Sequence, residues 1–249
     1  MSTPPIDLSG ENLTEGSFFN GRLQVVQPRS GYRFSIDAVL LAHLAIVRRD
    51  DVVLELGTGC GIVTLMMAYR RRNLRLYGVE IQPELAEVAR HNVTANRMQA
   101  RICILNMDMR LLSRDSISER IDMVVANPPY HQPGAGRRCT DRQRAIAREE
   151  ITVTLDQVLL TARGVLFKTG RMAVIYPAQR TVDLLARMRH FNLEPKTIRM
   201  IHSRVQGRAE LILVEAVKAA RPGLFVEPPL TIYNPAGGYS QEVGAMLKG

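Results

Sequence analysis

The sequence predicts an α/β fold with a seven-stranded, mostly parallel sheet, one antiparallel strand and helices on both faces. Short apolar runs alternate with helical stretches from about residue 50 onward, and this alternation is typical of a parallel sheet with crossover helices. The last two apolar runs have no helix between them. We expect these two to pair antiparallel, because a parallel return needs about a dozen residues or more.

Each expected element has its own signal in the chain. The strands are expected at the short apolar runs 51–56, 74–80, 102–106, 121–126, 171–176, 196–202 and 210–217. Stretches of helical composition lie at 62–69, 83–96, 145–162 and 178–190, and a further helix is expected at 36–47. Pro83 supports the second of these helices, because proline is favoured in a first helical turn.

The chain is expected to divide into three parts. Residues 1–49 form an N-terminal extension, 50–217 the α/β domain and 218–249 a C-terminal tail. The tail is rich in proline and glycine from Pro222 onward, so we expect it to pack loosely.

The composition excludes several classes of protein. Over 249 residues, 46% are hydrophobic and 23% charged, which is ordinary for a globular protein and excludes disorder, collagen and coiled coil. No apolar run approaches the roughly 20 residues of a membrane span, and the N-terminus lacks a secretory signal. Three scattered cysteines, Cys60, Cys103 and Cys139, predict neither a disulfide framework nor a metal site. A reduced, cytoplasmic protein is expected.

The charge balance favours a polyanionic partner. Lys and Arg number 33 against 24 Asp and Glu, a formal net charge of +9. Such an excess is typical of proteins that bind nucleic acid. Most of the cations are arginines, which suit bidentate phosphate contacts, although genomic codon bias explains this preference equally well.

A glycine-rich turn follows the first expected strand of the domain. Gly57, Gly59 and Gly61 come directly after the run 51–56, where they let the backbone turn sharply and approach a ligand closely. Their G-x-G-x-G spacing differs from the G-x-G-x-x-G of nicotinamide-binding folds, and the Gly-Lys-Ser/Thr of a Walker motif is absent. A plain structural turn is the alternative interpretation.

Two acidic residues follow the next two strands. Glu80 ends the second strand, where a carboxylate can accept both hydroxyls of a ribose; the alternative is a surface glutamate that caps the next helix. Asp108 follows the third strand between two methionines, where it could accept a hydrogen bond from an adenine amino group, or serve as a helix cap. The glycine turn and Glu80 together indicate an adenosine-type cofactor.

The segment Asn127-Pro128-Pro129-Tyr130 directly follows the fourth strand. The two prolines fix the backbone and donate no hydrogen bond, so the carbonyls of this turn are held rigidly. The Asn127 carboxamide oxygen and a neighbouring carbonyl can accept both hydrogens of a planar amino group, while Tyr130 stacks on the ring that bears it. This arrangement favours sp³ character at the nitrogen and hence its attack on an electrophilic carbon.

These motifs, in this order, resemble the class I S-adenosylmethionine-dependent methyltransferases, and Asn-Pro-Pro-Tyr resembles the signature of their amino- and amide-methylating branch. The resemblance spans roughly residues 20–217 and implies a Rossmann-like methyltransferase fold with S-adenosylmethionine as cofactor. It implies catalytic roles for Asn127, Pro128 and Tyr130. The cofactor-binding residues that it implies are Phe34, Asp37, Glu55, Gly57, Thr58, Gly59, Gly61, Glu80, Ile81, Asp108, Met109 and Asn127.

Within that branch the chain resembles the bacterial tRNA adenine-N6 methyltransferase group that acts on valine tRNA. The stretch 27–42 resembles the block before the first strand in that group, so the N-terminal extension is expected to cover the cofactor site. The segment 133–150 is an arginine-loaded loop beside the expected target pocket, where it can grip a phosphate backbone. The arginines expected to contact RNA there are Arg137, Arg138, Arg142 and Arg144.

The expected function is therefore N6-methylation of an adenine in tRNA, by direct displacement of the methyl group and without a metal. The closest alternative is a protein glutamine N5-methyltransferase that acts on a release factor or ribosomal protein, because glutamine also presents a planar amino group. A non-catalytic RNA-binding protein and, less favoured, a nicotinamide oxidoreductase are further alternatives.

Overall fold

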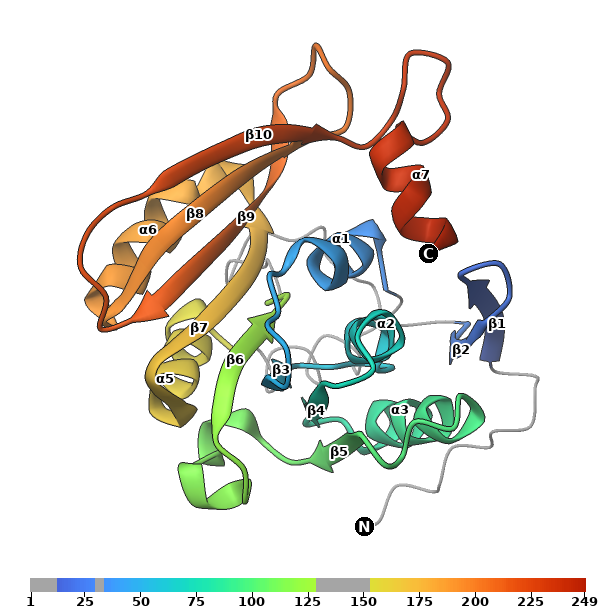
Figure 1. Ribbon diagram of the computed structural model, residues 1–249, viewed down its shortest axis with the longest axis vertical. Helices are drawn as coiled ribbons and strands as arrows, with labels where there is room; N and C mark the ends of the chain where they lie inside the picture. The colour runs from blue at the N-terminus through green and yellow to red at the C-terminus, as the bar shows by residue number, and fades with distance from the viewer. Residues whose placement is uncertain (1–12, 30–33, 129–152) are drawn as a thin grey trace, which may run out of the picture.

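A computed structural model describes residues 13–29, 34–128 and 153–249 (Figure 1). Its centre is an eight-stranded sheet in the order β10-β8-β9-β7-β6-β3-β4-β5. All seven predicted strands are present, and β9 alone among the eight runs antiparallel to its neighbours, β7 and β8. The strands are β3 (Val52–Leu56), β4 (Arg75–Glu80), β5 (Ile102–Asn106), β6 (Ile121–Ala126), β7 (Leu166–Pro177), β8 (Leu193–His202), β9 (Ala209–Lys218) and β10 (Phe225–Thr231).

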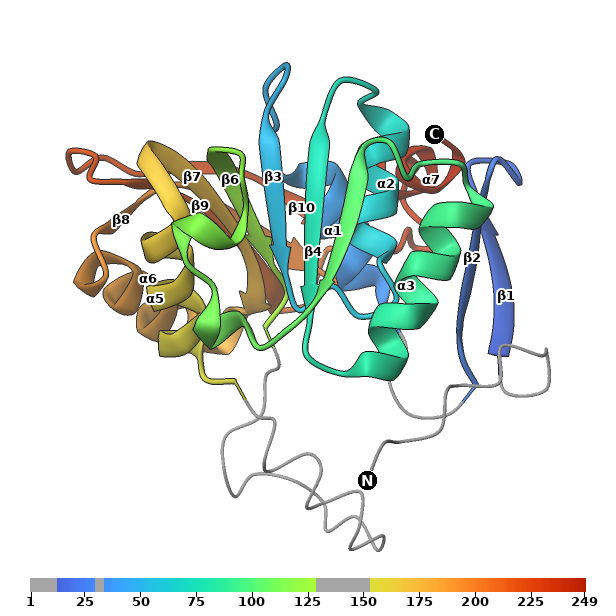
Figure 2. The same ribbon diagram turned by 90° about the horizontal axis from the view of Figure 1, so that it is seen from below.

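Helices cover both faces of the sheet, as predicted. Figure 2 shows α5 and α6 on one side and α2 and α3 on the other. Successive residues of β3 serve the two faces: Val53 belongs to the apolar cluster with α1, α2 and α3, and Leu54 to the cluster with α5 and α6. The helices are α1 (Ile36–Leu44), α2 (Ile62–Arg70), α3 (Pro83–Ala95), α5 (Leu155–Val165), α6 (Thr181–His190) and α7 (Gln241–Lys248). In the described part of the chain, none of them has the length and apolar character needed to cross a membrane.

The helix expected at 145–162 is described only from residue 153 onward. There α5 begins at Leu155, because Thr154 forms a capping box with Gln157. This arrangement satisfies backbone amides at the start of the helix.

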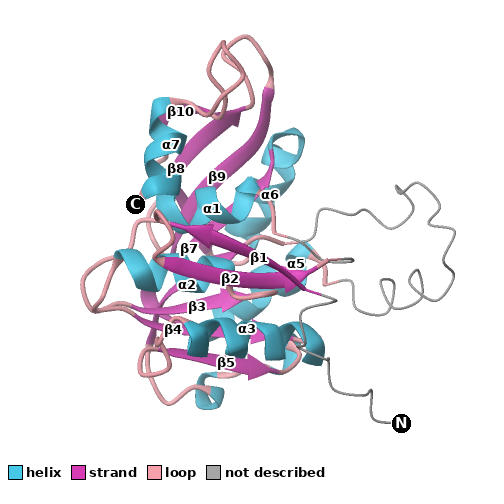
Figure 3. Cartoon of the chain, turned by 90° about the vertical axis from the view of Figure 1, so that its right-hand side faces the viewer, coloured by secondary structure: helices cyan, strands magenta, loops and turns pink. Residues whose placement is uncertain are grey.

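A two-stranded antiparallel hairpin precedes the sheet, at β1 (Leu13–Phe18) and β2 (Leu23–Pro28), and lies beside α2 and α3 (Figure 3). Two asparagines of α3 hold it. Asn92 accepts from the Val26 amide and donates to the Val26 carbonyl, both at 2.8 Å. One turn later Asn96 makes the same pair of bonds with Gln24, at 2.9 and 2.6 Å. Side-chain amides thus stand where a neighbouring strand would pair with β2.

The C-terminal tail is an integral part of the fold, so the expectation of loose packing was wrong. Strand β10 pairs parallel with β8, and helix α7 packs on α1. Leu230, Ile232 and Val243 are fully buried. The prolines that suggested a loose tail include Pro228 and Pro229, which lie at a register shift in an edge strand, where missing amide donors are tolerated.

Candidate functional site

The chain order of the strands reverses between β3 and β6. Strands β3, β4 and β5 follow one another on one side of this point, and the chain then returns to place β6 on the other side of β3. In such sheets ligands bind outside the carboxyl ends of the strands at the reversal. The parallel registers align Leu56 with both Ala126 and Val79, and Glu80 with Asn106. Consequently the glycine turn, Glu80 and Asn127 emerge together from this edge.

The glycine turn has the backbone geometry that its sequence predicts. Gly57, Gly59 and Gly61 have φ of 76°, 56° and 84°, values that side chains disfavour. The amides of Gly57 and Thr58 both donate to the Val79 carbonyl, at 2.9 and 3.0 Å. A Cβ on Gly61 would lie 3.3 Å from that of Ala89, so glycine here also permits the close approach of α2 and α3.

Glu55 is buried beneath this turn. One carboxylate oxygen accepts from the hydroxyls of Thr58 and Thr64 at 2.6 and 2.5 Å, and from the Thr64 amide at 3.1 Å. Burial raises the pKa of Glu55 to about 7, against the lowering effect of these bonds. Glu55 therefore connects the turn to the start of α2.

Glu80 connects two loops at the same edge. One of its oxygens accepts from the Gly59 amide and the other from the Gln82 amide, each at 2.9 Å. Burial raises the pKa of this carboxyl, and it is 5% exposed. Because each carboxylate oxygen has a second lone pair, Glu80 can hold the turn and still accept hydrogen bonds from a hydroxylated ligand.

Asp108 and Met109 lie at the end of β5. Asp108 caps a short 3-10 turn by accepting from the Arg110 amide at 2.9 Å, and it also pairs with the Arg110 guanidinium. These bonds keep the pKa of Asp108 below its usual value. The Met109 methyl group lies 3.9 Å from the position of a Cβ on Gly57. The segment after β5 therefore reaches the glycine turn.

Of the remaining predicted site residues, five are described by the structure and five are not. Asn127 is partly buried and Pro128 buried directly after β6. Ile81 is partly exposed after β4, and its carbonyl accepts from Asn106 at 3.2 Å. The Phe34 ring lies 5.6 Å from that of Phe18, and Asp37 lies in the first turn of α1. The predicted residues outside the described part of the chain are Tyr130, Arg137, Arg138, Arg142 and Arg144.

Two asparagines at this edge were missed by the sequence analysis. Asn106 donates to the Glu80 carbonyl at 2.9 Å and so ties the ends of β4 and β5 together. Asn92, besides holding β2, donates to the Cys60 carbonyl in the glycine turn at 2.9 Å. Asn106 could have been found from its position at a strand end, like Glu80. For Asn92 the signal is a polar residue on the inward face of an amphipathic helix.

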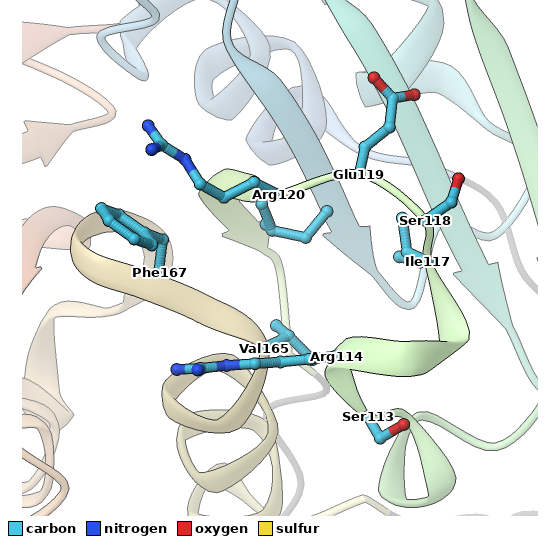
Figure 4. A pocket seen from close by; sticks show the side chains of 9 residues that line it. Ser113, Arg114, Ile117, Ser118, Glu119, Arg120, Val165 and Phe167 are labelled. Atoms are coloured by element: carbon cyan, nitrogen blue, oxygen red, sulfur yellow. The ribbon is translucent and has the colours of Figure 1, made fainter.

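A cavity among the described residues lies at the opposite end of the sheet (Figure 4). It has a volume of about 230 Å³ and lies between the segment 113–121 and the start of β7. Its polar lining has internal partners: Arg114 donates to the Gly164 and Leu166 carbonyls at the end of α5, and the Arg120 guanidinium lies 4.0 Å from the centre of the Phe167 ring. None of the predicted site residues that the structure describes lines this cavity. Across the described ranges, no group of three or more His, Cys, Asp or Glu residues is placed to hold a metal ion.

Comparison with known proteins gives the class of this chain. Residues 35–190 match the family model of the methyltransferase small domain. A solved structure described as a predicted O-methyltransferase from Agrobacterium tumefaciens superposes with a TM-score of 0.67 at 24% identity, over 84% of this chain and 94% of that one. The predicted Rossmann-like methyltransferase fold is thus confirmed, with one strand more than expected.

Sequence relatives define the chain further. It is 36% identical over 190 residues to the tRNA1(Val) (adenine(37)-N6)-methyltransferase of Porphyromonas gingivalis, which covers 74% of this chain and 71% of that one. A protein of the same name from Phocaeicola vulgatus is 30% identical and covers 90% and 92%. The chain belongs to the methyltransferase small domain family, and the prediction of a methyltransferase is confirmed.

Proposed function

We propose that this enzyme transfers a methyl group from S-adenosylmethionine to N6 of adenine 37 in tRNA1(Val). The observation that carries the proposal is the position of Asn127, which leaves β6 directly beside the glycine turn that follows β3. The shared name of the relatives from Porphyromonas gingivalis and Phocaeicola vulgatus supports the choice of substrate.

The residues at the carboxyl edge fit S-adenosylmethionine. The glycine turn offers backbone without side chains to the methionine part of the cofactor, and Glu80 accepts hydrogen bonds from the ribose hydroxyls. Asp108 accepts from the adenine amino group by sharing its carboxylate with Arg110, and Met109 packs on the ring. Glu55, Thr58 and Asn92 lie behind the glycine turn and stabilise its backbone conformation, without contacting the cofactor themselves. Phe34, Asp37 and Ile81 border the site.

The bound cofactor supplies an electrophilic methyl group on a sulfonium. Asn127 and the backbone carbonyl beside it accept the two hydrogens of the target amine and direct its lone pair toward that methyl group. Pro128 keeps this turn rigid, and Tyr130 stacks on the target base. The rate enhancement comes mainly from orientation and preorganised dipoles. The proton leaves the methylated nitrogen to solvent, so no strong general base is needed.

The substrate is an anticodon-loop adenine, because a loop base is extruded at less cost than a base in a stem. The net charge of +9 attracts the tRNA. Arg137, Arg138, Arg142 and Arg144 contact its phosphates.

The test is methyl transfer from labelled S-adenosylmethionine to two in vitro transcripts of tRNA1(Val), one native and one with adenine 37 replaced by guanine. Purified release factors are offered in a third reaction. We expect label only in the native transcript, and recovery of that label as N6-methyladenosine after digestion to nucleosides. Label only in the release factors would replace the proposal with glutamine methylation. Bound cofactor without label in any reaction would contradict methyl transfer to these acceptors.

A further inference from the structure

Two loops lie side by side at the carboxyl ends of β8 and β10. Thr231 at the end of β10 pairs with His202 at the end of β8. The pairing continues beyond the strands, because the Ile232 amide donates to the His202 carbonyl at 2.8 Å and the Tyr233 amide to the Ser203 carbonyl at 3.0 Å. Figure 1 shows both loops projecting from the sheet, in orange and red. We call residues 203–208 and 233–239 the tyrosine–arginine ridge.

The second loop presents a fixed pair of aromatic rings. Tyr233 and Tyr239 form a β-bridge, and their rings stack with centroids 5.5 Å apart and an interplanar angle of 17°. Asn234 closes the loop by donating to the Tyr239 carbonyl at 3.0 Å and accepting from the Gly238 amide at 3.1 Å. The Tyr239 side chain is nevertheless 45% exposed. The Tyr239 ring is therefore ordered and exposed before any ligand binds, so that binding a ligand to it costs little further side-chain entropy.

The first loop carries two exposed arginines without counter-ions. Arg204 and Arg208 are exposed and form no ion pair with any described residue. The loop is held by the His202 imidazole, which donates to the Gly207 carbonyl at 2.8 Å, and by a 2.9 Å bond from the Gly207 amide to the Arg204 carbonyl. The segments 203–208 and 233–239 contain no acidic residue. The two segments of the ridge thus carry only positive charge beside an aromatic face, and the nearest acidic residues in sequence are Glu210 and Glu242.

The ridge lies on the same edge of the sheet as Asn127. Strand β8 runs parallel to β6 and is separated from it by β9 and β7, a displacement of about 14 Å across the sheet at the usual strand spacing. The registers align Ala126 with Val174, Val214 and Ile198, so His202 lies four residues, about 13 Å, further along its strand. The base of the ridge is therefore roughly 20 Å from Asn127, a distance that one RNA stem-loop spans. An RNA whose target base lies at Asn127 would therefore pass over the ridge.

We propose that the tyrosine–arginine ridge binds the single-stranded part of the RNA substrate outside the target base, with Tyr239 stacking on a base and Arg204 and Arg208 on phosphates. Exposed aromatic rings flanked by cations are how proteins hold single-stranded nucleic acid. The inference rests on the proposed function, because it takes tRNA as the ligand. It adds a contact surface outside the site of methyl transfer.

The test uses the full chain and native tRNA1(Val) transcript, with binding and methylation measured separately. The double variant Arg204→Ala/Arg208→Ala is expected to bind tRNA about tenfold more weakly, with a salt dependence reduced by about 1.4 in log–log slope. Its affinity for S-adenosylmethionine should stay unchanged. Tyr239→Ala should weaken tRNA binding by at least about fivefold, and Tyr239→Phe should retain it, because stacking needs the ring alone.

The matched control is Arg71→Ala/Arg72→Ala, which removes the same charge from exposed positions after α2, at the opposite end of the sheet. Equal weakening by the two double variants would mean a general charge effect and would overturn the ridge as a specific surface. If the ridge variants bind tRNA as tightly as the wild type does, and the wild type methylates tRNA, the ridge is refuted and the proposed function still stands. A wild-type protein that neither binds nor methylates tRNA would overturn both.

Discussion

Glu55 shows how a single buried carboxyl group can make the stability of the cofactor turn depend on pH. Its three hydrogen bonds from Thr58 and Thr64 favour the charged form, but the loss of hydration on burial opposes it more strongly, and the pKa rises from 4.5 to about 7. Between pH 4.5 and about pH 7, Glu55 is protonated in the folded protein and ionised in the unfolded chain. The protonated carboxyl therefore stabilises the fold at low pH, and this contribution is lost as the pH rises through about 7.

We predict that Glu55→Gln removes this pH dependence. The free energy of unfolding of the wild type, relative to that of the variant, should fall by on the order of 3 kcal/mol between pH 5 and pH 8. Denaturant unfolding at several pH values measures it. The control is Glu87→Gln, an exposed glutamate of α3, whose curve should run parallel to that of the wild type. Parallel curves for Glu55→Gln as well would contradict the raised pKa.

Asn127 allows a sharper test of catalysis. Asn127→Ala should lower kcat by roughly a hundredfold or more, because it removes an acceptor that orients the reacting amine. The dissociation constant for S-adenosylmethionine should change little. Isothermal titration with the cofactor and single-turnover methylation separate the two effects. The control is Asn73→Ala, at an exposed asparagine beyond α2 that bonds Asp50; it should change neither kcat nor the dissociation constant. Retained turnover in Asn127→Ala would rule out the role of Asn127 in orienting the amine.

At the scale of elements, α3 connects the N-terminal hairpin to the glycine turn. Asn92 and Asn96 both bond β2, but only Asn92 also reaches the Cys60 carbonyl in the turn. The hairpin and the turn therefore share one buried side chain. When the hairpin packs on α3 it orders the Asn92 side chain, and Asn92 then holds the backbone of the glycine turn at Cys60.

This difference predicts separable effects of two isosteric substitutions. Asn92→Asp loses both amide donors and should weaken S-adenosylmethionine binding by about tenfold or more, since a buried acceptor in the turn is left unpaired. Asn96→Asp should loosen the hairpin, seen as faster hydrogen exchange in β2, with a much smaller effect on cofactor affinity. Equal losses of affinity in the two variants would mean that Asn92 acts only through the hairpin.

Most elements of the sheet could be predicted from the sequence, because a buried parallel strand is a nearly continuous apolar run. The expected 102–106 and 121–126 coincide with β5 and β6. Strand β7 begins five residues earlier than expected. Its start pairs with Ile121, a register shift follows, and Thr169 has a positive φ, so the polar residues of this irregularity hid the beginning of the strand. The hairpin was missed although Asn20-Gly21 is a typical hairpin signal.

The candidate site was predictable where a motif follows a strand, because the carboxyl ends of parallel strands meet at one edge. The glycine turn, Glu80 and Asn127 were placed in this way, although their ligand contacts remain predictions. The support of the turn was not predictable. Asn92 lies on a helix distant in sequence from both Cys60 and Val26, and a single side chain gives no sign of which backbone groups it will meet.

At the scale of the whole molecule, the two ends of the described chain are joined. The Phe19 amide donates to the Leu247 carbonyl in α7 at 3.1 Å, and the Phe19 ring stacks on Tyr69 of α2 with centroids 4.4 Å apart. Helix α7 buries Val243 completely. The tail therefore stabilises the hairpin as well as the edge of the sheet.

We predict that Val243→Asp detaches α7 and lowers the free energy of unfolding by about 2–4 kcal/mol, because a charge would be buried without a partner. The β1–β2 hairpin should become more sensitive to limited proteolysis in the same variant. Val182→Asp is the matched control, since this valine of α6 is 79% exposed. Unchanged stability of Val243→Asp would show that α7 is dispensable.

The contact between Phe19 and α7 also bears on how the protein is made. Asn20, in the hairpin turn, and Lys248, in α7, are 228 residues apart and joined by a hydrogen bond. At about 5–20 residues per second of synthesis, the hairpin waits on the order of ten seconds or longer for the helix that covers it. During translation Phe19 therefore lacks its contact with α7 until that helix has left the ribosome, so this part of the fold closes late.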